Sequence, residues 1–398
     1  MANSFKSNLS KLKNLFGKRS KYLNACTPTI SGSDAGYDVA AYIWPSYTNH
    51  DKRSWIFWPN GEGEWQTVRS ATPKFPGHSQ PRVPLLGYRD EAEPKTMEEQ
   101  IELATSHGVN VFIYDWYWYD RRPFLECCLN DGFLKAKNRN KMRFYLMWAN
   151  HDANYTWDKR IAEVQDTPVW LGSVDRVQFD IIADRIIEKY FSQPNYYTID
   201  GKPVFSIYDI DNLIKGLGGL NNTRDALDSF RDKTKAAGFP GLHLQFILYA
   251  KQKHDLSGVD GNKIHSIDLA HTLGFDSTTN YQFAHLTYID RDYNSIMADI
   301  YSKWQDFSEL GLPYFPHVSL GWDNNPRFNS FRHGIMRNNT PENVKKALYA
   351  AKNFADAHGV KLITVNSWNE WTETSYLLPD NVNGTGYLDA IKEVFYSA

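Results

Sequence analysis

Lys361-Leu-Ile-Thr-Val-Asn-Ser-Trp-Asn-Glu370-Trp-Thr-Glu373 is the stretch of this 398-residue chain that most strongly indicates its fold and function. Its first part, Leu362 to Val365, is a short apolar, β-branched run with the composition of a buried strand. Two carboxylates and two indoles follow directly. Glutamate is seldom buried without a partner, because an unpaired buried charge is costly, so stability alone does not explain this pair. The pattern predicts acid/base carboxylates at a strand exit; the alternative is a polar loop whose glutamates face water.

The same order of strand, polar and aromatic strand end, and helix recurs about eight times along the chain. The predicted strands are Tyr37–Pro45, Val109–Tyr114, Arg143–Met147, Pro203–Asp209, Leu242–Tyr249, Leu269–Tyr281, Tyr314–Leu320 and Lys361–Val365. The predicted helices are Thr96–His107, Ser173–Phe191, Thr223–Ala237, Tyr293–Leu310, Pro341–His358 and Tyr387–Tyr396. This repeat predicts a single-domain α/β protein, a (β/α)₈ TIM barrel over residues 37–398. A doubly wound open sheet is the alternative, but the Gly-rich phosphate turn that it would require is missing from the sequence.

Two segments stand outside the repeat. Residues 50–93 are rich in Gly, Pro and Trp, and we predict a structured loop at the face formed by the strand ends. Residues 1–36 are predicted to be a basic extension, with apolar residues at helical spacing among lysines and arginines. A mobile tail, a helix packed under the domain and a helix at a membrane surface are the three interpretations of this extension.

A closed barrel brings the ends of all its strands to one face, so residues far apart in sequence should meet there. We predict Glu370 and Glu373 as the catalytic pair. Around them we predict a substrate-binding cleft made of strand-end residues: Trp44, Tyr47, Asp115, Trp116, Trp118, Trp148, Asn150, His151, Tyr208, Asp209, Tyr249, Tyr281, Trp322, Asp323, Arg327, Asn366 and Trp368.

Some of these residues have a structural alternative. Asp115 and Asp209 are expected either to bind hydroxyls and position the catalytic pair, or to cap loops. Arg327 is expected to bind an anionic group such as a uronate, or to pair with Asp323. His151 beside Asp152 is predicted to be a hydrogen-bonding group of the cleft, since no second histidine follows at metal-ligand spacing.

Composition limits the classes of partner. The 13 Trp, 24 Tyr and 22 Phe residues suit a surface that stacks on sugar rings, in addition to a large core. The 44 basic and 46 acidic residues are mixed along the chain, which argues against nucleic acid. No apolar run is long enough to span a membrane. Three cysteines, two of them adjacent, form no disulfide framework or zinc motif.

The predicted partner is therefore an oligosaccharide or polysaccharide, with no cofactor and no metal. Breaking a glycosidic bond needs one carboxyl group to protonate the leaving oxygen and a second to act as base or nucleophile. Glutamates three residues apart on a tight turn can lie on the same side, at a spacing that suits retention of configuration better than inversion. This function favours a periplasmic or secreted location, although the N-terminus lacks the apolar centre of a signal peptide.

Five ordered motifs resemble the WbsX-like proteins related to glycoside hydrolase family 99. They are the runs Trp65–Pro81, Tyr114–Trp118, Trp148–Asn150, Gly321–Arg327 and Trp368–Glu373. The resemblance covers residues 37 to 390 and implies a (β/α)₈ fold that acts on an α-linked glycan with retention.

The resemblance also implies roles for the two glutamates. The first glutamate of the family's E-W-x-E motif removes the proton of the sugar 2-hydroxyl, giving a 1,2-anhydro intermediate, and the second is acid and then base. These roles fall on Glu370 and Glu373. The chain departs from the family pattern at Thr372, where Gly is usual, and in residues 374–380, which leaves the substrate open. A glycosyltransferase of O-antigen-type polysaccharide synthesis and a non-catalytic glycan-binding barrel are the rival functions. Asp209-Ile-Asp211 is a candidate for the DxD pair that a transferase would need.

Overall fold

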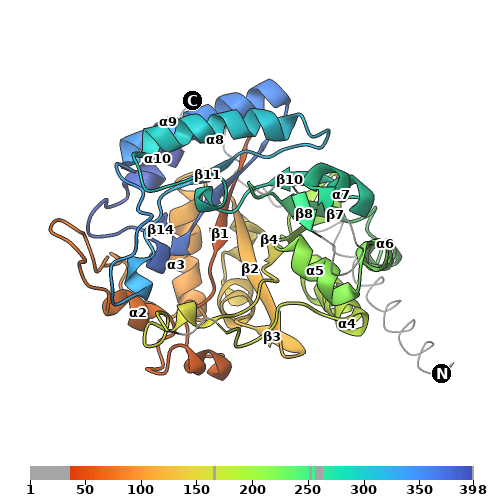
Figure 1. The fold of residues 1–398 in the computed structure, drawn as a ribbon, viewed down its shortest axis with the longest axis horizontal. Helices are drawn as coiled ribbons and strands as arrows, with labels where there is room; N and C mark the ends of the chain where they lie inside the picture. Colours follow the sequence, from red (N-terminus) through yellow and green to blue (C-terminus); the bar gives the residue numbers. More distant parts are fainter. Residues whose placement is uncertain (1–35, 165–166, 251–252, 256–262, 397–398) are drawn as a thin grey trace.

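The computed structural model describes residues 36–164, 167–250, 253–255 and 263–396. Residues 1–35, almost all of the predicted basic extension, lie outside this range. Within the described residues, eight parallel strands follow one another round the sheet in chain order (Figure 1). They are β1 (Asp38–Ile43), β2 (Val111–Tyr119), β4 (Arg143–Trp148), β6 (Lys202–Ile207), β7 (His243–Ile247), β10 (Ser277–Thr279), β11 (His317–Ser319) and β12 (Leu362–Asn366).

The sheet closes on itself at two places that an open sheet would leave unpaired. The last strand, β12, pairs in parallel with the first, β1, from Asp38↔Leu362 to Ala41↔Val365. Between β10 and β11 a single parallel bridge joins Thr278 to Tyr314. The predicted (β/α)₈ barrel is confirmed, and the alternative of a doubly wound sheet is wrong.

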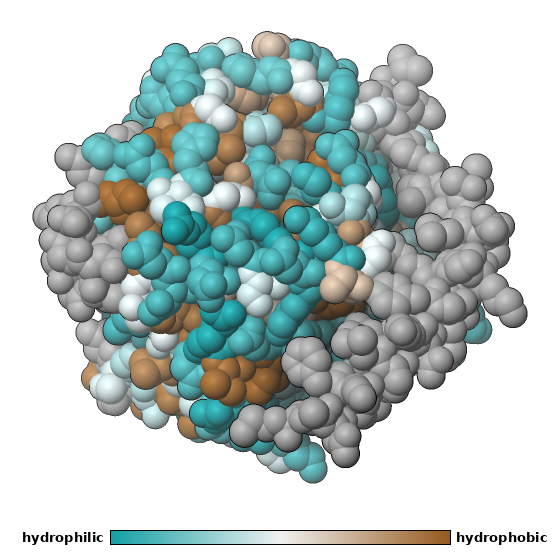
Figure 2. All heavy atoms as spheres, turned by 90° about the vertical axis from the view of Figure 1, so that its right-hand side faces the viewer, coloured by the Kyte–Doolittle hydropathy of each residue, from teal (hydrophilic) through white to brown (hydrophobic). Residues whose placement is uncertain are grey.

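The helices form the outer layer of the barrel. They are α2 (Trp65–Arg69), α3 (Pro94–Thr105), α4 (Arg176–Ile186), α5 (Ile210–Leu217), α6 (Leu220–Ala236), α7 (Ser266–Leu273), α8 (Tyr293–Ser308), α9 (Pro341–His358) and α10 (Gly386–Phe395). In Figure 1, α8, α9 and α10 lie together along the upper edge, and α4 to α7 cover the right-hand side. The coloured part of that second side is mainly hydrophilic, with hydrophobic residues in small groups (Figure 2).

The other described strands are short. They are β3 (Arg122–Phe124), which extends β2 as a hairpin, β5 (Thr198–Ile199), β8 (Lys253–Asp255), β9 (Lys263–His265), β13 (Asn369–Glu370) and β14 (Ser375–Tyr376).

Helix α9 shows how local sequence sets an element. The side chain of Thr340 caps it by accepting from the Asn343 N–H at 3.3 Å, and Pro341 occupies the first turn, where its missing N–H costs nothing. Gly359 ends the helix at φ +67°, a conformation that other residues adopt only under strain. The chain then enters β12 three residues later.

The sixth strand differs from its prediction. Of the predicted range Leu269–Tyr281, only Ser277–Thr279 is strand, and Leu269 belongs to α7. The reason is a polar barrel interior at this point: the hydroxyl of Thr279 bonds to that of Thr364 at 2.9 Å, and His317 bonds to the same Thr364 hydroxyl at 2.9 Å. Hydrophobic periodicity does not detect a strand that buries hydroxyl groups.

A buried carboxyl group fastens the 50–93 segment to the strand ends. Glu91 accepts from Gln100 Nε2 at 3.0 Å and from Asn369 Nδ2 at 2.8 Å, and its backbone N–H donates to the carbonyl of Tyr47. Asn369 Nδ2 also donates to the carbonyl of Trp44. Burial raises the pKa of Glu91 to about 8, although both side-chain hydrogen bonds oppose the rise.

We expect Glu91 to make the protein less stable as the pH rises. The unfolded chain loses this proton near its ordinary value of 4.5, whereas the folded protein keeps it up to about 8. The stabilising contribution is therefore complete below the unfolded value and is lost between the two, at up to about 1.4 kcal/mol per pH unit. Glu91→Gln should make the fall in the free energy of unfolding from pH 5 to pH 8 shallower by that slope, as measured by urea denaturation. The exposed Glu99→Gln is the matched control, and an unchanged slope in Glu91→Gln would contradict the assignment.

Candidate active site

The two predicted catalytic glutamates lie on a tight hairpin that follows β12. Glu370 ends β13, Trp371–Glu373 form one turn of 3₁₀ helix, and Thr374 turns the chain back at φ +54° into β14. The N–H of Glu370 donates to the hydroxyl of Ser367 at 2.7 Å. This backbone places both glutamates on the same side of the hairpin, where one guanidinium group contacts both.

Arg327 is the group that joins them. Its Nη2 donates to Glu370 Oε1 at 2.7 Å, and its Nη1 donates to Glu373 Oε1, also at 2.7 Å. Neither carboxylate faces bulk solvent: Glu370 is 3% exposed, and the side chain of Glu373 is 12% exposed. The planar fork of Arg suits this double contact in a way that the point charge of Lys does not.

One of the two predictions for Arg327, a pair with Asp323, is wrong. Asp323 instead contacts His78 Nε2 at 2.7 Å and accepts from Asn325. A third carboxylate, Glu64, lies 3.6 Å from Arg327 Nε, so the guanidinium is surrounded by negative charge. With its charge already shared among three carboxylates, Arg327 has little left with which to attract an anionic sugar.

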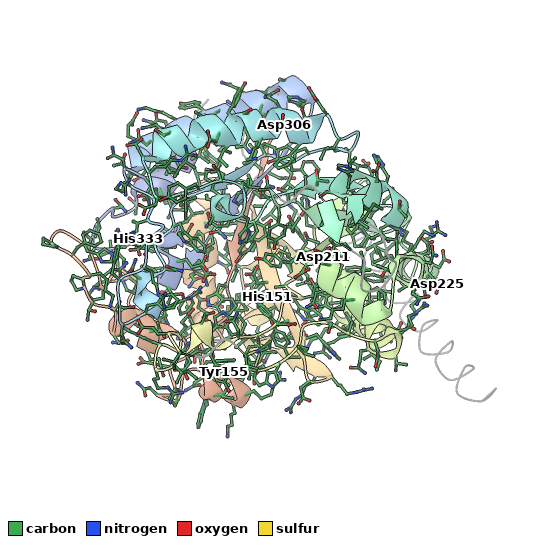
Figure 3. The ribbon with its side chains drawn as sticks, in the orientation of Figure 1. His151, Tyr155, Asp211, Asp225, Asp306 and His333 are labelled. Carbon is green, nitrogen blue, oxygen red and sulfur yellow. The ribbon has the colours of Figure 1, made fainter. Side chains whose placement is uncertain are left out.

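A cavity of about 370 Å³ opens above this cluster. Nine of the predicted site residues line it: Trp44, Asp115, His151, Tyr208, Tyr281, Trp322, Arg327, Glu370 and Glu373. They come from seven different strands or the segments that follow them, as convergence in a barrel requires. Figure 3 shows His151 near the centre of the molecule, in contrast to Asp225 and Asp306 on the outer helices.

Seven lining residues were not predicted: Tyr117, Met147, Ala149, Asn154, Thr156, Trp157 and His285. Tyr117 and Met147 belong to the predicted strands or their ends, so alternation along β2 and β4 would have found them. Asn154, Thr156 and Trp157 come from the segment after β4, where no local signal indicates which side chains turn inward.

The other predicted residues do not line this cavity, and most of them are held by neighbours in the fold. Nε1 of Trp116 donates to Glu126 at 2.8 Å and Nε1 of Trp368 donates to Gln100 at 2.7 Å, while Trp148 packs against Phe179. Tyr47 Oη accepts from the Trp371 N–H, and Asn366 accepts from Gln282. Asp323 is held by its contacts with His78 and Asn325.

Four of these predicted residues lie behind the cavity or away from it: Asn150, Asp209, Tyr249 and Trp118. Asn150 exchanges two hydrogen bonds with the backbone of Asp209, whose carboxylate caps α5 by accepting from the Asn212 N–H at 2.9 Å. Tyr249 stacks behind the lining residue His285 at 4.8 Å. Trp118 lines a separate cleft, together with Trp170.

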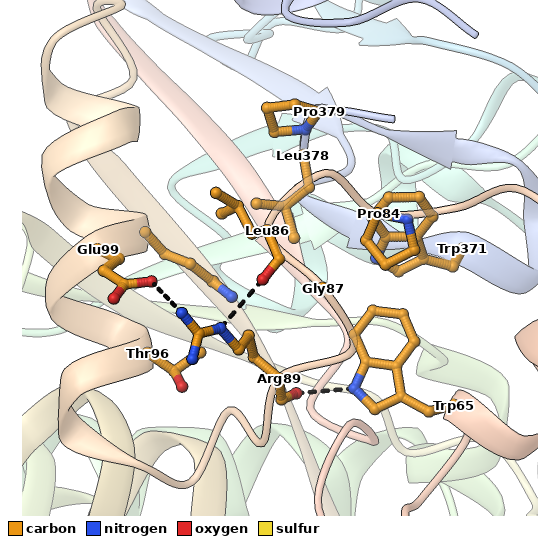
Figure 4. Close-up of a pocket in the computed structure, with 11 residues that line it drawn as sticks. Trp65, Pro84, Leu86, Gly87, Arg89, Thr96, Glu99, Trp371, Leu378 and Pro379 are labelled. Atoms are coloured by element: carbon orange, nitrogen blue, oxygen red, sulfur yellow. Dashed lines mark hydrogen bonds and ion pairs between the residues drawn. The ribbon is translucent and has the colours of Figure 1, made fainter. Parts of the chain in front are cut away.

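Trp371 lies between the two glutamates in the sequence but on the other side of the hairpin in space. It stacks on Tyr376 at 3.9 Å and lines a slot of about 10 Å³ with Trp65, Leu86 and Leu378 (Figure 4). A space of this size accommodates about one water molecule. The slot is therefore a packing feature and cannot receive a sugar.

Burial governs the protonation of the cavity. It raises the pKa of Glu370 well above its ordinary range, with help from the charge of Glu373, while Arg327 opposes the rise. The pKa of Glu373 is also raised by burial and opposed by Arg327. Two interacting carboxyl groups titrate as a pair, and burial favours the protonated form of this pair.

A third carboxyl group faces the same cavity. Burial raises the pKa of Asp115 well above its ordinary range, although Tyr281 Oη donates to its Oδ2 at 2.9 Å. Burial has the opposite effect on the imidazoles: it lowers the pKa of His151, and that of His285 to about 4. The cavity thus offers neutral imidazoles and carboxyl groups, which suit hydroxyl groups as hydrogen-bond partners.

Among the residues that the structure describes, no group of three or more His, Cys, Asp or Glu side chains is placed to hold a metal ion. The Asp209-Ile-Asp211 pair is engaged within the fold, since Asp209 caps α5 and Asp211 Oδ1 contacts His254 Nδ1 at 2.6 Å. No helix in the described part of the chain is long and apolar enough to cross a membrane.

Similar solved structures define the class of protein. An endo-alpha-mannosidase of family GH99 from Bacteroides thetaiotaomicron superposes with a TM-score of 0.59 at 13% identity, covering 89% of this chain and 95% of the other. A structure described as a glycoside hydrolase-like protein also gives 0.59, at 15% identity, covering 94% of this chain and 98% of the other. At such identities the likeness shows a shared fold, and the class is therefore that of (β/α)₈ barrel proteins.

Sequence comparison identifies the family. The family described as "Glycosyltransferase WbsX" matches residues 39–391, so the chain belongs to the WbsX family. It is 24% identical over 377 residues to the uncharacterized protein WxcX of Xanthomonas campestris pv. campestris strain ATCC 33913. That match covers 90% of this chain and 50% of WxcX, as does the match to WxcX of strain B100, so the chain spans about half the length of these curated relatives. The predicted resemblance is confirmed.

Removing Arg327 should leave three buried carboxyl groups without a counter-charge. We expect Arg327→Met to lower the free energy of unfolding at pH 8 by about 3–5 kcal/mol, the usual effect of breaking a buried ion pair. The pKa values of Glu370 and Glu373, already raised, would rise further. Their contribution is present at low pH and lost as the pH increases, so the deficit should shrink toward pH 5.

Urea denaturation at pH 5 and pH 8 measures this difference. Arg122→Met is the matched control, because Arg122 forms an exposed ion pair with Asp120 that contributes at most about 1 kcal/mol. A deficit in Arg327→Met that is equal at both pH values would show that the cation does not control the charge of the pair.

Proposed function

We propose that this protein cleaves an α-linked bond of an oligosaccharide or polysaccharide with retention of configuration, using Glu370 and Glu373. The observation that supports this most strongly is that both carboxyl groups open into one aromatic cavity while a single guanidinium contacts both. A buried acid/base pair beside a sugar-sized cavity is what glycoside cleavage requires. The glycoside hydrolase-like fold and the glycan-related family support the same class of substrate.

The proposed reaction has two steps, with roles that the family resemblance implies. In the first, Glu370 takes the proton of the sugar 2-hydroxyl, O2 forms a bond to C1, and the C1–oxygen bond to the leaving group breaks as Glu373 protonates that oxygen. In the second, Glu373 removes a proton from water, the water oxygen bonds to C1, and the C1–O2 bond breaks as Glu370 returns its proton to O2. Two inversions at C1 give net retention.

The lining residues suit an uncharged sugar ring. The indoles of Trp44, Trp157 and Trp322 supply apolar surface that can contact the carbon face of a sugar. Asp115 and Tyr281, joined by a hydrogen bond, supply polar groups for hydroxyls. A volume of about 370 Å³ lies within the usual range of small-ligand sites.

The two glutamate variants test the assignment. Glu370→Gln and Glu373→Gln should each lower kcat on a natural glycan by about 10²–10⁴-fold, the usual contribution of a general acid or base. On an α-glycosyl fluoride, whose leaving group needs no proton, Glu373→Gln should recover much of its activity in the first step, and Glu370→Gln should not. Glu99→Gln is the control, and circular dichroism checks folding. Near-normal turnover of the glycan by either variant would refute the assignment.

One experiment can identify both the substrate and the stereochemistry of its cleavage. A screen of α-linked oligosaccharides and polysaccharides, followed by proton NMR of the first product formed, should show the α-anomer before mutarotation. Initial formation of the β-anomer would exclude retention. Measurable sugar binding without any product would favour the non-catalytic barrel instead.

The description of the family as glycosyltransferases favours a second function, transfer of a sugar to a growing polysaccharide. The same acid/base pair can serve transfer if a sugar hydroxyl takes the place of water in the second step. A nucleotide-dependent transferase should bind a nucleotide sugar and release the nucleotide. Isothermal titration with UDP- and GDP-sugars distinguishes the two functions, because the hydrolase should show no binding.

A further inference from the structure

The inner side of the Arg327 guanidinium is held by two residues that the proposed reaction does not use. Arg327 Nε donates to the hydroxyl of Thr372 at 2.9 Å, and that hydroxyl donates to Glu64 Oε1 at 3.0 Å. The guanidinium therefore has its two outer nitrogens on the glutamate pair and its inner nitrogen on the Thr372–Glu64 unit.

Glu64 is among the most enclosed carboxylates of the described chain, with 0% exposure. Its Oε2 accepts from the hydroxyl of Ser46 at 3.1 Å and from the indole Nε1 of Trp44, which itself lines the cavity. These neighbours come from the segment after β1, from the β13–β14 hairpin and from Arg327. Glu64 therefore joins three distant parts of the chain. Four hydrogen-bonding or charged neighbours for one carboxylate indicate a group whose position is fixed.

We propose that Glu64 and Thr372 are positioning residues which hold Arg327 on Glu370 and Glu373, and that the charge of Glu64 keeps the pair singly protonated at neutral pH. This inference deepens the proposed function and rests on it for its catalytic consequence. It adds a residue from the 50–93 segment to a site otherwise made of strand ends.

The negative charge of Glu64 affects the protonation of Glu370 and Glu373. A guanidinium bound to two carboxylates favours the form in which both are ionised, and a pair without a proton has no general acid. The negative charge of Glu64 offsets that of Arg327, and it contributes to the raised pKa values of both Glu370 and Glu373. Without Glu64, the full positive charge of Arg327 would act on the pair.

Thr372 contributes its hydroxyl to the arrangement. It stands between Trp371 and Glu373 on the hairpin, and a residue without a side-chain oxygen could not accept from Arg327 Nε. The hydroxyl of Thr372 is fully buried and acts as acceptor for Arg327 and donor to Glu64. The Thr372 hydroxyl thus joins the positive charge of Arg327 to the negative charge of Glu64.

The pH dependence of turnover tests the role of Glu64. In Glu64→Gln the pair should lose its last proton more easily, so the alkaline limb of the kcat–pH profile should move down by about one pH unit, a tenfold loss of rate on that limb. The acidic side of the profile should stay within about twofold of the wild type. Glu91→Gln is the matched control: it is another buried glutamate of the same segment, contacts Gln100 and Asn369 but not Arg327, and should leave the limb in place.

Thr372 is tested by a pair of variants of similar size. Thr372→Val removes the acceptor for Arg327 Nε and should lower kcat by about tenfold with KM nearly unchanged, whereas Thr372→Ser restores the hydroxyl and should restore kcat. Equal activity of the Val and Ser variants would overturn the role of the hydroxyl. An alkaline limb in Glu64→Gln that coincides with that of Glu91→Gln would overturn the role of the charge.

A second readout separates this inference from the proposed function. If the pair of glutamates in Glu64→Gln has pKa values closer to the ordinary range, the loss of unfolding free energy between pH 5 and pH 8 should be shallower than in the wild type and in Glu99→Gln. This shallower slope with no glycan cleaved by the wild type would reject the proposed hydrolase and retain the Glu64 assignment. Equal slopes in Glu64→Gln and the wild type would reject the assignment itself.

Discussion

The contact of one guanidinium with two carboxylates is the interaction on which the site depends. Glu370 and Glu373 are buried side by side, and a doubly ionised pair in such a place would be strongly destabilised without a cation. Arg327 makes the arrangement stable, and because its charge also favours ionisation, the site needs a further acidic group to keep a proton. The same charged side chains therefore set both the stability of the folded site and the protonation of the glutamate pair.

The barrel is what brings these charges together. Glu64 lies in a loop after β1, Arg327 after β11 and the glutamates after β12, and the pairing of β12 with β1 closes the ring that makes their loops neighbours. An open sheet of the same strands would leave the first and last strand ends on opposite edges. Closure of the sheet is thus a condition for the site as well as for the fold.

Hydrolysis and glycosyl transfer can use the same acid and base groups in a site of this kind. Both functions need a protonated group at the departing oxygen and a base, and they differ in whether water or a sugar hydroxyl attacks C1. The neutral imidazoles of His151 and His285 and the aromatic walls would serve either acceptor. The structural likeness to glycoside hydrolases and the family's description as glycosyltransferases are therefore compatible with one chemistry.

The sequence alone determined the (β/α)₈ repeat, and it predicted Glu370, Glu373 and seven other residues that line the cavity, because strand periodicity and local residue types depend on short segments. It missed Glu64 and the true partner of Arg327, and it overassigned Trp116, Trp148 and Trp368 to the cleft. An indole at a strand end can face the cavity or the helix layer, and Glu64 meets Arg327 and Thr372 only because distant parts of the chain fold together. Only the closed tertiary structure decides those directions, because burial and charge pairing depend on distance in space rather than along the chain.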